Sequence, residues 1–327
     1  MKGMRRCCFG LLVLTACGTD PGAPAPGGTA GSAGSAGSSS SGGAGASSGG
    51  SAGQASGGTA GSATGGAGGS NGGSAGSGGT AGSAGSAGGA GTFFGASRCT
   101  GEFDLCEDFE GAELDTNRWE IQGDAPTLDA ARAARGSKSA HFHTEDNGHS
   151  LIRESATFPA ANNSYWARIF VYIDALPTAP DWAHWTISGA VGSGTDAEIR
   201  VGGQLNSNAG INLFGVGTDG GPTGDWTNLD DDPAGDPVVP PEHEWICVEW
   251  QHKGDTDETR FFWDGVEHPS LYTSSSEHGG SGDPYLLPEF ESVWFGWWLY
   301  QAGTTPGAFD IWIDEIAVDG ERIGCEN

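Results

Sequence analysis

Basic residues are scarce in this chain, and regular helical patterning is missing. Its 14 lysines and arginines stand against 42 aspartates and glutamates, which gives a formal net charge of −28. So few cations cannot neutralise a run of phosphates, and nucleic acid is therefore excluded as a partner. No long stretch repeats its apolar residues every 3.6 positions, so a helical architecture is excluded as well. The chain also has no Cys-x-x-Cys pair, which argues against a zinc site.

The N-terminal residues have the features of a bacterial export signal. Basic residues precede Phe9–Leu14, an apolar run too short to span a bilayer. The Leu-Thr-Ala-Cys that ends this segment matches a lipobox, whose cysteine is acylated and becomes the first mature residue. We therefore expect a signal peptide at 1–16, lipid on Cys17, and membrane attachment through that lipid alone. Gly18 in place of a retention aspartate favours the outer membrane or cell surface of a Gram-negative bacterium. An ordinary signal peptide with a chance cysteine is the alternative.

Residues 17–97 are rich in glycine, serine and alanine. Positions 19–91 contain no aromatic residue, and Asp20 is their only charged residue. Such a segment cannot bury enough apolar surface to offset its conformational entropy, so we expect a disordered linker. It would hold a folded domain away from the membrane.

Residues 98–327 make up the predicted domain. They hold all twelve tryptophans, all but one of the acidic residues and all but three of the basic ones. About 230 residues are enough for one sizeable core, and we expect a monomer. Four cysteines in an exported domain indicate two disulfides, for which three connectivities exist. We favour a short local loop, Cys99–Cys106, together with Cys247–Cys325.

Strand-like segments alternate with turn-forming stretches throughout this domain. This pattern predicts an all-β fold, a jelly-roll β-sandwich. The stretch 128–136, LDAARAARG, is open to one short helix or an extended piece. The predicted strands are 139–144, 151–158, 165–173, 184–189, 197–205, 210–216, 245–253, 259–263, 293–300 and 309–318.

Three motifs resemble those of concanavalin A-like jelly-roll domains that bind or act on polysaccharides. They are CEDFEG at 106–111 followed by Trp119-Glu120, a GSKS turn at 136–139, and FDIWIDEIAVDGERIGC at 309–325. Within that fold, the frame most resembles the fungal cellulose-induced proteins and glucuronan lyases. The resemblance covers roughly residues 104–325 and is more specific for fold than for activity. It implies that one concave sheet holds a glycan across its strands.

The stretch FGWWLYQAG, which begins at Phe295, is aromatic on both faces of its predicted strand. Because alternate residues of a strand share a face, Phe295, Trp297 and Leu299 would fill the core. Trp298 and Tyr300 would then face the groove, where their rings offer flat apolar surfaces with a polar handle. Packing of all five within the core is the structural alternative.

The same fold can also carry catalysis. Laminarinase-type hydrolases carry Glu-x-Asp-x-x-Glu, which is absent here, so hydrolysis is disfavoured. A lyase must neutralise a uronate carboxylate, remove the adjacent proton and protonate the leaving oxygen. Residue type and strand alternation give the lyase candidates His184, Tyr300, Arg168, Arg200 and Gln204. The candidates for sugar contact are Trp298, Tyr300, Trp166 and Gln251.

A structural calcium ion is implied by the resemblance, since in that group one links the N-terminal motif to the last strand. The matching positions are Glu110, Asp314 and a carbonyl near Ser137. His141 and His143 share a face, but the sequence offers no third ligand at a suitable spacing. The acidic run 229–236 lacks the spacing of an EF-hand loop and is interpreted as a solvated loop.

The sequence therefore predicts a surface-anchored lipoprotein whose jelly-roll domain engages polysaccharide. β-Elimination at uronates is the sharper hypothesis, and whether the domain is an enzyme stays open. A non-catalytic carbohydrate-binding module and a structural or adhesive surface protein are the alternatives. The strong negative charge favours binding, or a neutral glycan, over capture of a polyuronate.

Overall fold

The computed structural model describes residues 93–99, 101–194, 197–220, 226–227, 237–276, 278 and 284–326. All of them belong to one unit, Gly79–Asn327. The predicted signal peptide, Cys17, the linker before residue 93 and the acidic run 229–236 lie outside the described residues. Among the residues that are described, no helix has the length and apolar character to cross a membrane.

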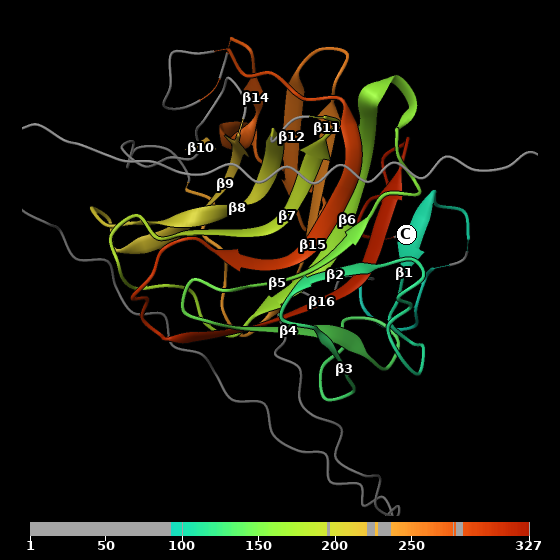
Figure 1. Cartoon of the computed structure of the whole chain (residues 1–327), viewed down its shortest axis with the longest axis horizontal. Coiled ribbons are helices and arrows are strands. Elements are labelled where there is room, and N and C mark those ends of the chain that lie inside the picture. Colours follow the sequence, from blue (N-terminus) through green and yellow to red (C-terminus); the bar gives the residue numbers. More distant parts are fainter. Residues whose placement is uncertain are drawn as a thin grey trace, which may run out of the picture. The chain divides into compact units, whose positions relative to one another are not determined.

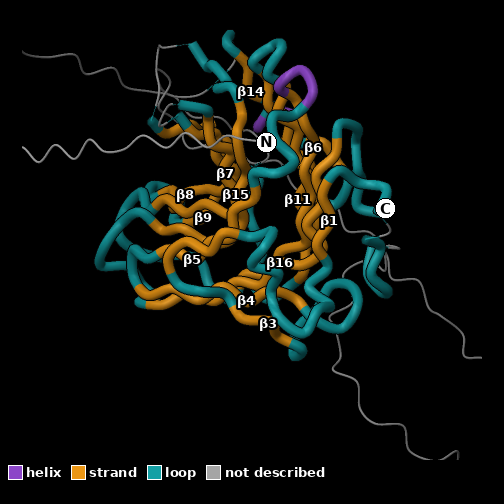
Figure 2. Tube along the Cα trace, turned by 45° about the vertical axis from the view of Figure 1, so that its right-hand side comes forward, coloured by secondary structure: helices purple, strands orange, loops and turns teal. Residues whose placement is uncertain are grey.

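The described chain folds into two antiparallel sheets that form an all-β jelly-roll sandwich, as predicted. Figure 1 shows β8, β7, β15 and β5 in one layer, and Figure 2 separates β5, β8 and β9 from β1, β6 and β11. The nine-stranded sheet has the order β13-β12-β11-β6-β16-β4-β3, with β1 paired to β16 and β14 to β12. The seven-stranded sheet has the order β10-β9-β8-β7-β15-β5-β2.

The strand bounds are as follows. The nine-stranded sheet contains β1 (Leu105–Glu107), β3 (Thr127–Asp129), β4 (Ser139–Glu145), β6 (Ser164–Ile173), β11 (Trp245–Lys253), β12 (Glu258–Trp263), β13 (Val266–Glu267), β14 (Thr273–Ser274) and β16 (Ala308–Asp319). The seven-stranded sheet contains β2 (Glu120–Gly123), β5 (His149–Glu154), β7 (His184–Gly192), β8 (Glu198–Asn206), β9 (Ile211–Asp219), β10 (Trp226–Thr227) and β15 (Phe290–Leu299). Two single 3₁₀ turns, η1 (Ala161–Asn163) and η2 (Pro269–Leu271), complete the described elements.

All ten predicted strands are present, and β11 has the predicted bounds. The short strands β1, β2, β3, β10, β13 and β14 were not predicted. The stretch 128–136 forms no helix: it begins within β3 and continues as bends and turns.

The core lies between the two sheets and is rich in aromatic side chains. Strand β15 contributes Phe295, Trp297 and Leu299, each fully buried, as the alternation predicts. Trp297 stacks on Trp185 of β7 with ring centroids 5.5 Å apart. One face of β15 is thereby committed to the core, which leaves its other aromatic residues on the outside of the sandwich.

Both ends of the described chain pack on the outer face of the nine-stranded sheet. The predicted disulfides Cys99–Cys106 and Cys247–Cys325 are both formed, and the second ties β11 to the C-terminus. Phe94, placed in the linker by the sequence, contacts Phe170 of β6. The C-terminus lies beside β1 (Figure 1). These segments cover the middle of this sheet, whereas they do not reach the outer face of the other sheet.

Candidate functional site

The outer face of the seven-stranded sheet carries a row of aromatic side chains along β15. Trp294 is buried, whereas Trp298 and Tyr300 are partly exposed. The rings of Trp298 and Tyr300 stack with centroids 4.9 Å apart, and Trp294 lies 6.2 Å from Trp298. His149, opposite Trp298 on β5, lies 5.0 Å from the Trp298 ring. We call Trp294, Trp298 and Tyr300 the aromatic row.

A bulge interrupts the pairing of β15 with β7 beside this row. The pairing of β15 with β7 shifts between Phe295 and Trp298, next to Gly296. Gly296 has φ +146°, and a Cβ there would lie 2.1 Å from the Ser150 carbonyl oxygen. Only glycine tolerates that combination, so the bulge is built into the sequence.

Arg200 of β8 reaches over the row. Its guanidinium carbon lies 4.4 Å from the Tyr300 ring centroid and 5.5 Å from that of Trp298. Two carboxylates hold it there, because Nε donates to Glu198 at 2.8 Å and Nη2 donates to Asp219 at 2.6 Å. The indole N–H of Trp294 also donates to Glu198. Arg200 thus stacks as a cation on the rings, while its charge is more than balanced by the two carboxylates.

Polar groups flank the end of the row. His184 of β7 lies directly opposite Gln204 of β8, so the two side chains share this face. The ring Nδ1 of His184 lies 3.0 Å from the side-chain nitrogen of Gln301, and the Tyr300 N–H donates to the His184 carbonyl. The residues His184, Gln204 and Tyr300, three of the lyase candidates, therefore come together on this face.

The hydroxyl groups of Tyr300 and Thr186 are both buried and lie beside each other. Burial raises the pKa of the Tyr300 phenol, so it stays protonated at neutral pH. The end of the aromatic row thus carries two neighbouring hydroxyl groups.

Three further candidates lie on the other sheet. Arg168 is on β6, fully buried, and its Nη2 donates to Glu315 at 3.2 Å, so it does not join His184 and Tyr300. Trp166 of β6 and Gln251 of β11 are paired across the outer face of the nine-stranded sheet. Both are half-buried, and the Arg322 guanidinium lies 5.7 Å from the Trp166 ring.

The residues expected to hold calcium accept hydrogen bonds from the turn at 134–138 instead of facing a metal site. Glu110 accepts from the Ser137 N–H at 2.6 Å, the Ser137 hydroxyl at 2.5 Å and the Lys138 N–H at 2.8 Å. The Lys138 ammonium donates to the carbonyls of Glu110 and Gly111.

Asp314 likewise accepts the N–H groups of Ala134 and Arg135 at 2.8 and 2.9 Å. In the described part of the chain, no three acidic, His or Cys side chains are grouped to hold a metal. As arranged, the residues do not fit calcium, since donors occupy the oxygens that it would use. Calcium binding itself stays an untested prediction.

His141 and His143 meet a residue that the sequence did not indicate. Asp310 of β16 lies opposite His143 in the sheet, and one of its oxygens is 2.7 Å from His141 Nε2 and 2.8 Å from His143 Nδ1. The two imidazoles hold the pKa of Asp310 below its usual value, although burial opposes this. His141 also stacks on Trp312 at 4.4 Å. The placement of His141 and His143 on one face therefore has a structural explanation, which is their shared contact with Asp310.

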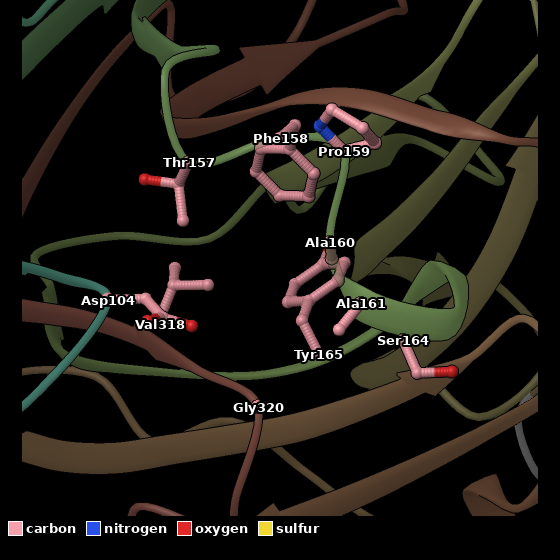
Figure 3. Close-up of a pocket in the computed structure, with 10 residues that line it drawn as sticks. All are labelled: Asp104, Thr157, Phe158, Pro159, Ala160, Ala161, Ser164, Tyr165, Val318 and Gly320. Atoms are coloured by element: carbon pink, nitrogen blue, oxygen red, sulfur yellow. The ribbon is translucent and has the colours of Figure 1, made fainter.

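A pocket of about 260 Å³ lies away from the aromatic row. Figure 3 shows the segment from Thr157 to Ala161 on one side of it and Asp104, Val318 and Gly320 on the other. Its lining is mostly apolar or small, and it contains none of the predicted site residues. The aromatic row thus remains the stronger candidate site.

Comparison with known proteins supports the fold and leaves the function open. A solved structure named as cellulose induced protein, Cip1, is similar over 68% of this chain and 99% of its own, with 20% identity and a TM-score of 0.52. The binding domain of botulinum neurotoxin DC, in complex with SialylT, is 10% identical and has a TM-score of 0.35. This chain spans 45% of that second chain. No family model matches the chain, and no curated protein matches it.

Proposed function

We propose that the outer face of the seven-stranded sheet binds a polysaccharide, and that the favoured ligand is a neutral glycan. The observation that supports this most directly is the aromatic row, with two partly exposed rings beside His184 and Gln204. Sugar rings combine apolar faces with hydroxyl groups, and this face combines rings with hydrogen-bonding groups.

Charge favours a neutral ligand over a polyuronate. Arg200 stacks on this row, yet Glu198 and Asp219 already accept its hydrogen bonds. Arg153, opposite Trp294 on β5, is likewise paired, with Glu291 at 3.4 Å. The Arg200 cluster thus carries one positive and two negative charges, in a chain of net charge −28. A uronate carboxylate brought to this face would be repelled rather than neutralised.

β-Elimination at uronates is the second candidate function. The convergence of His184, Gln204 and Tyr300 at one end of this face favours it. Two observations oppose it. The raised pKa of Tyr300 disfavours a phenolate that could act as the base. Arg200 is already paired with Glu198, so it is not available to neutralise the carboxylate of a uronate.

The test is calorimetric titration of the full chain with soluble neutral β-glucan and with glucuronan. We expect binding of the neutral polymer, with affinity reduced at least tenfold in Trp298→Ala and unchanged in Trp166→Ala, which removes a half-buried tryptophan from the other sheet. Equal loss in both variants would overturn the assignment to this face. Ultraviolet absorbance of unsaturated uronate, appearing with glucuronan and lost in His184→Ala, would establish the lyase instead.

We further propose that this domain is displayed at the cell surface by a lipid on Cys17. The lipobox and the Gly/Ser-rich linker support this proposal. Globomycin treatment of the expressing cells, which blocks lipoprotein signal cleavage, tests it. The precursor should accumulate, and a Cys17→Ser variant should fail to enter the membrane fraction.

A further inference from the structure

Trp182 stands out beside the proposed binding face. It precedes β7 by two residues and is 38% exposed, the only tryptophan among the exposed large apolar side chains of the described chain. Single exposed apolar residues are common on protein surfaces and need no function. Exposure alone therefore assigns nothing to Trp182.

The backbone of Trp182 adds an independent observation. Its φ is +62°, in the left-handed region that residues with bulky side chains rarely occupy. Such a conformation is unfavourable and persists only where the surroundings impose it. Here the Trp182 N–H donates to the Ser207 hydroxyl at 3.1 Å, and the N–H of the next residue, the fully buried Ala183, donates to the Pro180 carbonyl at 3.2 Å. The chain thus holds a strained tryptophan whose side chain remains substantially exposed.

The position of Trp182 relates it to the aromatic row. Two residues span at most about 7 Å, so Trp182 lies close to His184, whose carbonyl accepts the Tyr300 N–H. Ser207, its hydrogen-bond partner, directly follows β8, the strand that carries Arg200 and Gln204. Trp182 therefore lies at the end of the face where His184, Gln204 and Tyr300 come together.

We propose that the Trp182 indole is a second sugar platform for the same polysaccharide, beyond the end of the aromatic row. This inference rests on the proposed function, because it extends that face by one more ring. A glycan chain that passes Trp298 and Tyr300 continues over Trp182, and its strained backbone presents the indole to that chain. Trp182 accordingly contributes more to binding long oligosaccharides than to binding short ones.

The variant Trp182→Gly separates binding from folding. Glycine adopts positive φ without strain, so removing the side chain relieves the backbone. We expect Tm to be unchanged or higher, while calorimetry shows at least fivefold weaker binding of a long neutral β-glucan oligosaccharide and little change for a disaccharide. Phe94→Ala, which removes a 42% exposed aromatic ring on the other sheet, serves as the matched control and should bind like wild type.

Each outcome decides the inference. Wild-type affinity in Trp182→Gly, with binding lost in Trp298→Ala, would overturn the second platform and leave the proposed function intact. A fall in Tm accompanying the weaker binding would show that Trp182 maintains the loop, which would also overturn it. If wild type binds none of the neutral glycans, the proposed function fails, and this inference fails with it.

Discussion

Glu315 of β16 has a fully buried carboxylate between two fully buried guanidinium groups. Arg135 Nη1 lies 2.5 Å and Arg168 Nη2 3.2 Å from the same oxygen. Burial lowers the pKa of Arg168 to about 10, which still leaves it charged at neutral pH. The carboxylate is therefore needed chiefly because the two cations are buried beside it.

Glu315→Gln should be strongly destabilising. Removing one member of a buried ion pair typically costs about 3–5 kcal/mol, since the remaining charge is left uncompensated. We expect a loss of that size in urea unfolding at pH 7. Glu267→Gln is the matched control, because it breaks the exposed pair with Arg260 and should change stability by about 0–1 kcal/mol. Similar losses in both variants would contradict the role of burial.

His252 of β11 predicts a specific loss of stability in acid. Its ring is buried against Tyr165 and Phe290, and burial lowers its pKa from 6.5 to about 3. The unfolded chain therefore binds a proton below pH 6.5 that the folded chain does not, so this contribution to stability falls as pH drops from 6.5 towards 3. Full expression of the shift would amount to roughly 4–5 kcal/mol.

The measurement is urea unfolding of wild type and His252→Gln at pH 7.0, 5.5 and 4.5. Because the carboxylates titrate in both proteins, their effect cancels when the two are compared. The difference between wild type and variant in how the free energy of unfolding changes with pH therefore reports on His252. We expect wild type to lose more stability than the variant as pH falls. Parallel curves would show that His252 is already solvated in the folded state.

At the scale of elements, strand alternation could be predicted from the sequence, but the partner of each strand could not. The pattern in β15 separates Trp297 from Trp298 without reference to any other strand. The same alternation made Arg168 and Arg200 equivalent candidates, although they lie on different sheets. An odd or even position specifies the face of the strand on which a residue lies, but it does not specify the sheet to which that strand belongs.

Pairing between distant strands explains the other differences. Asp310 could not be identified as the partner of His143, because 167 residues separate them and only the β4–β16 register joins them. Strands β1, β2 and β3 are three or four residues long, too short for alternation to be recognised.

Two neighbouring tryptophans of β15 should respond differently to truncation. Trp297 is fully buried in the core, and Trp297→Ala should cost about 3–5 kcal/mol through the cavity left behind. Trp298 is partly exposed, so Trp298→Ala should cost less stability while removing glycan binding. Chemical unfolding and calorimetric titration of both variants measure this. A larger stability loss in Trp298→Ala would mean that the outer row is part of the core.

At the scale of the whole molecule, the two sheets have different outer faces. Both described chain ends pack on the nine-stranded sheet, and its buried ion pairs and the Cys247–Cys325 disulfide lie there. Phe93 and Phe94, the first described residues, thus pack on the nine-stranded sheet rather than on the sheet that carries the aromatic row.

The two disulfides should therefore differ in their contribution to the stability of the whole domain. Cys247 and Cys325 are 78 residues apart, whereas Cys99 and Cys106 are 7 apart. In the chain-entropy account, closing the longer loop stabilises by about 4.5 kcal/mol and the shorter by about 2.5 kcal/mol, because the longer cross-link restricts the unfolded chain more. We expect the double variant Cys247→Ala/Cys325→Ala to have a clearly lower Tm than Cys99→Ala/Cys106→Ala in thermal unfolding. The reverse order would show that the Cys99–Cys106 loop holds the N-terminal segment against β16, and that this local attachment outweighs the long cross-link.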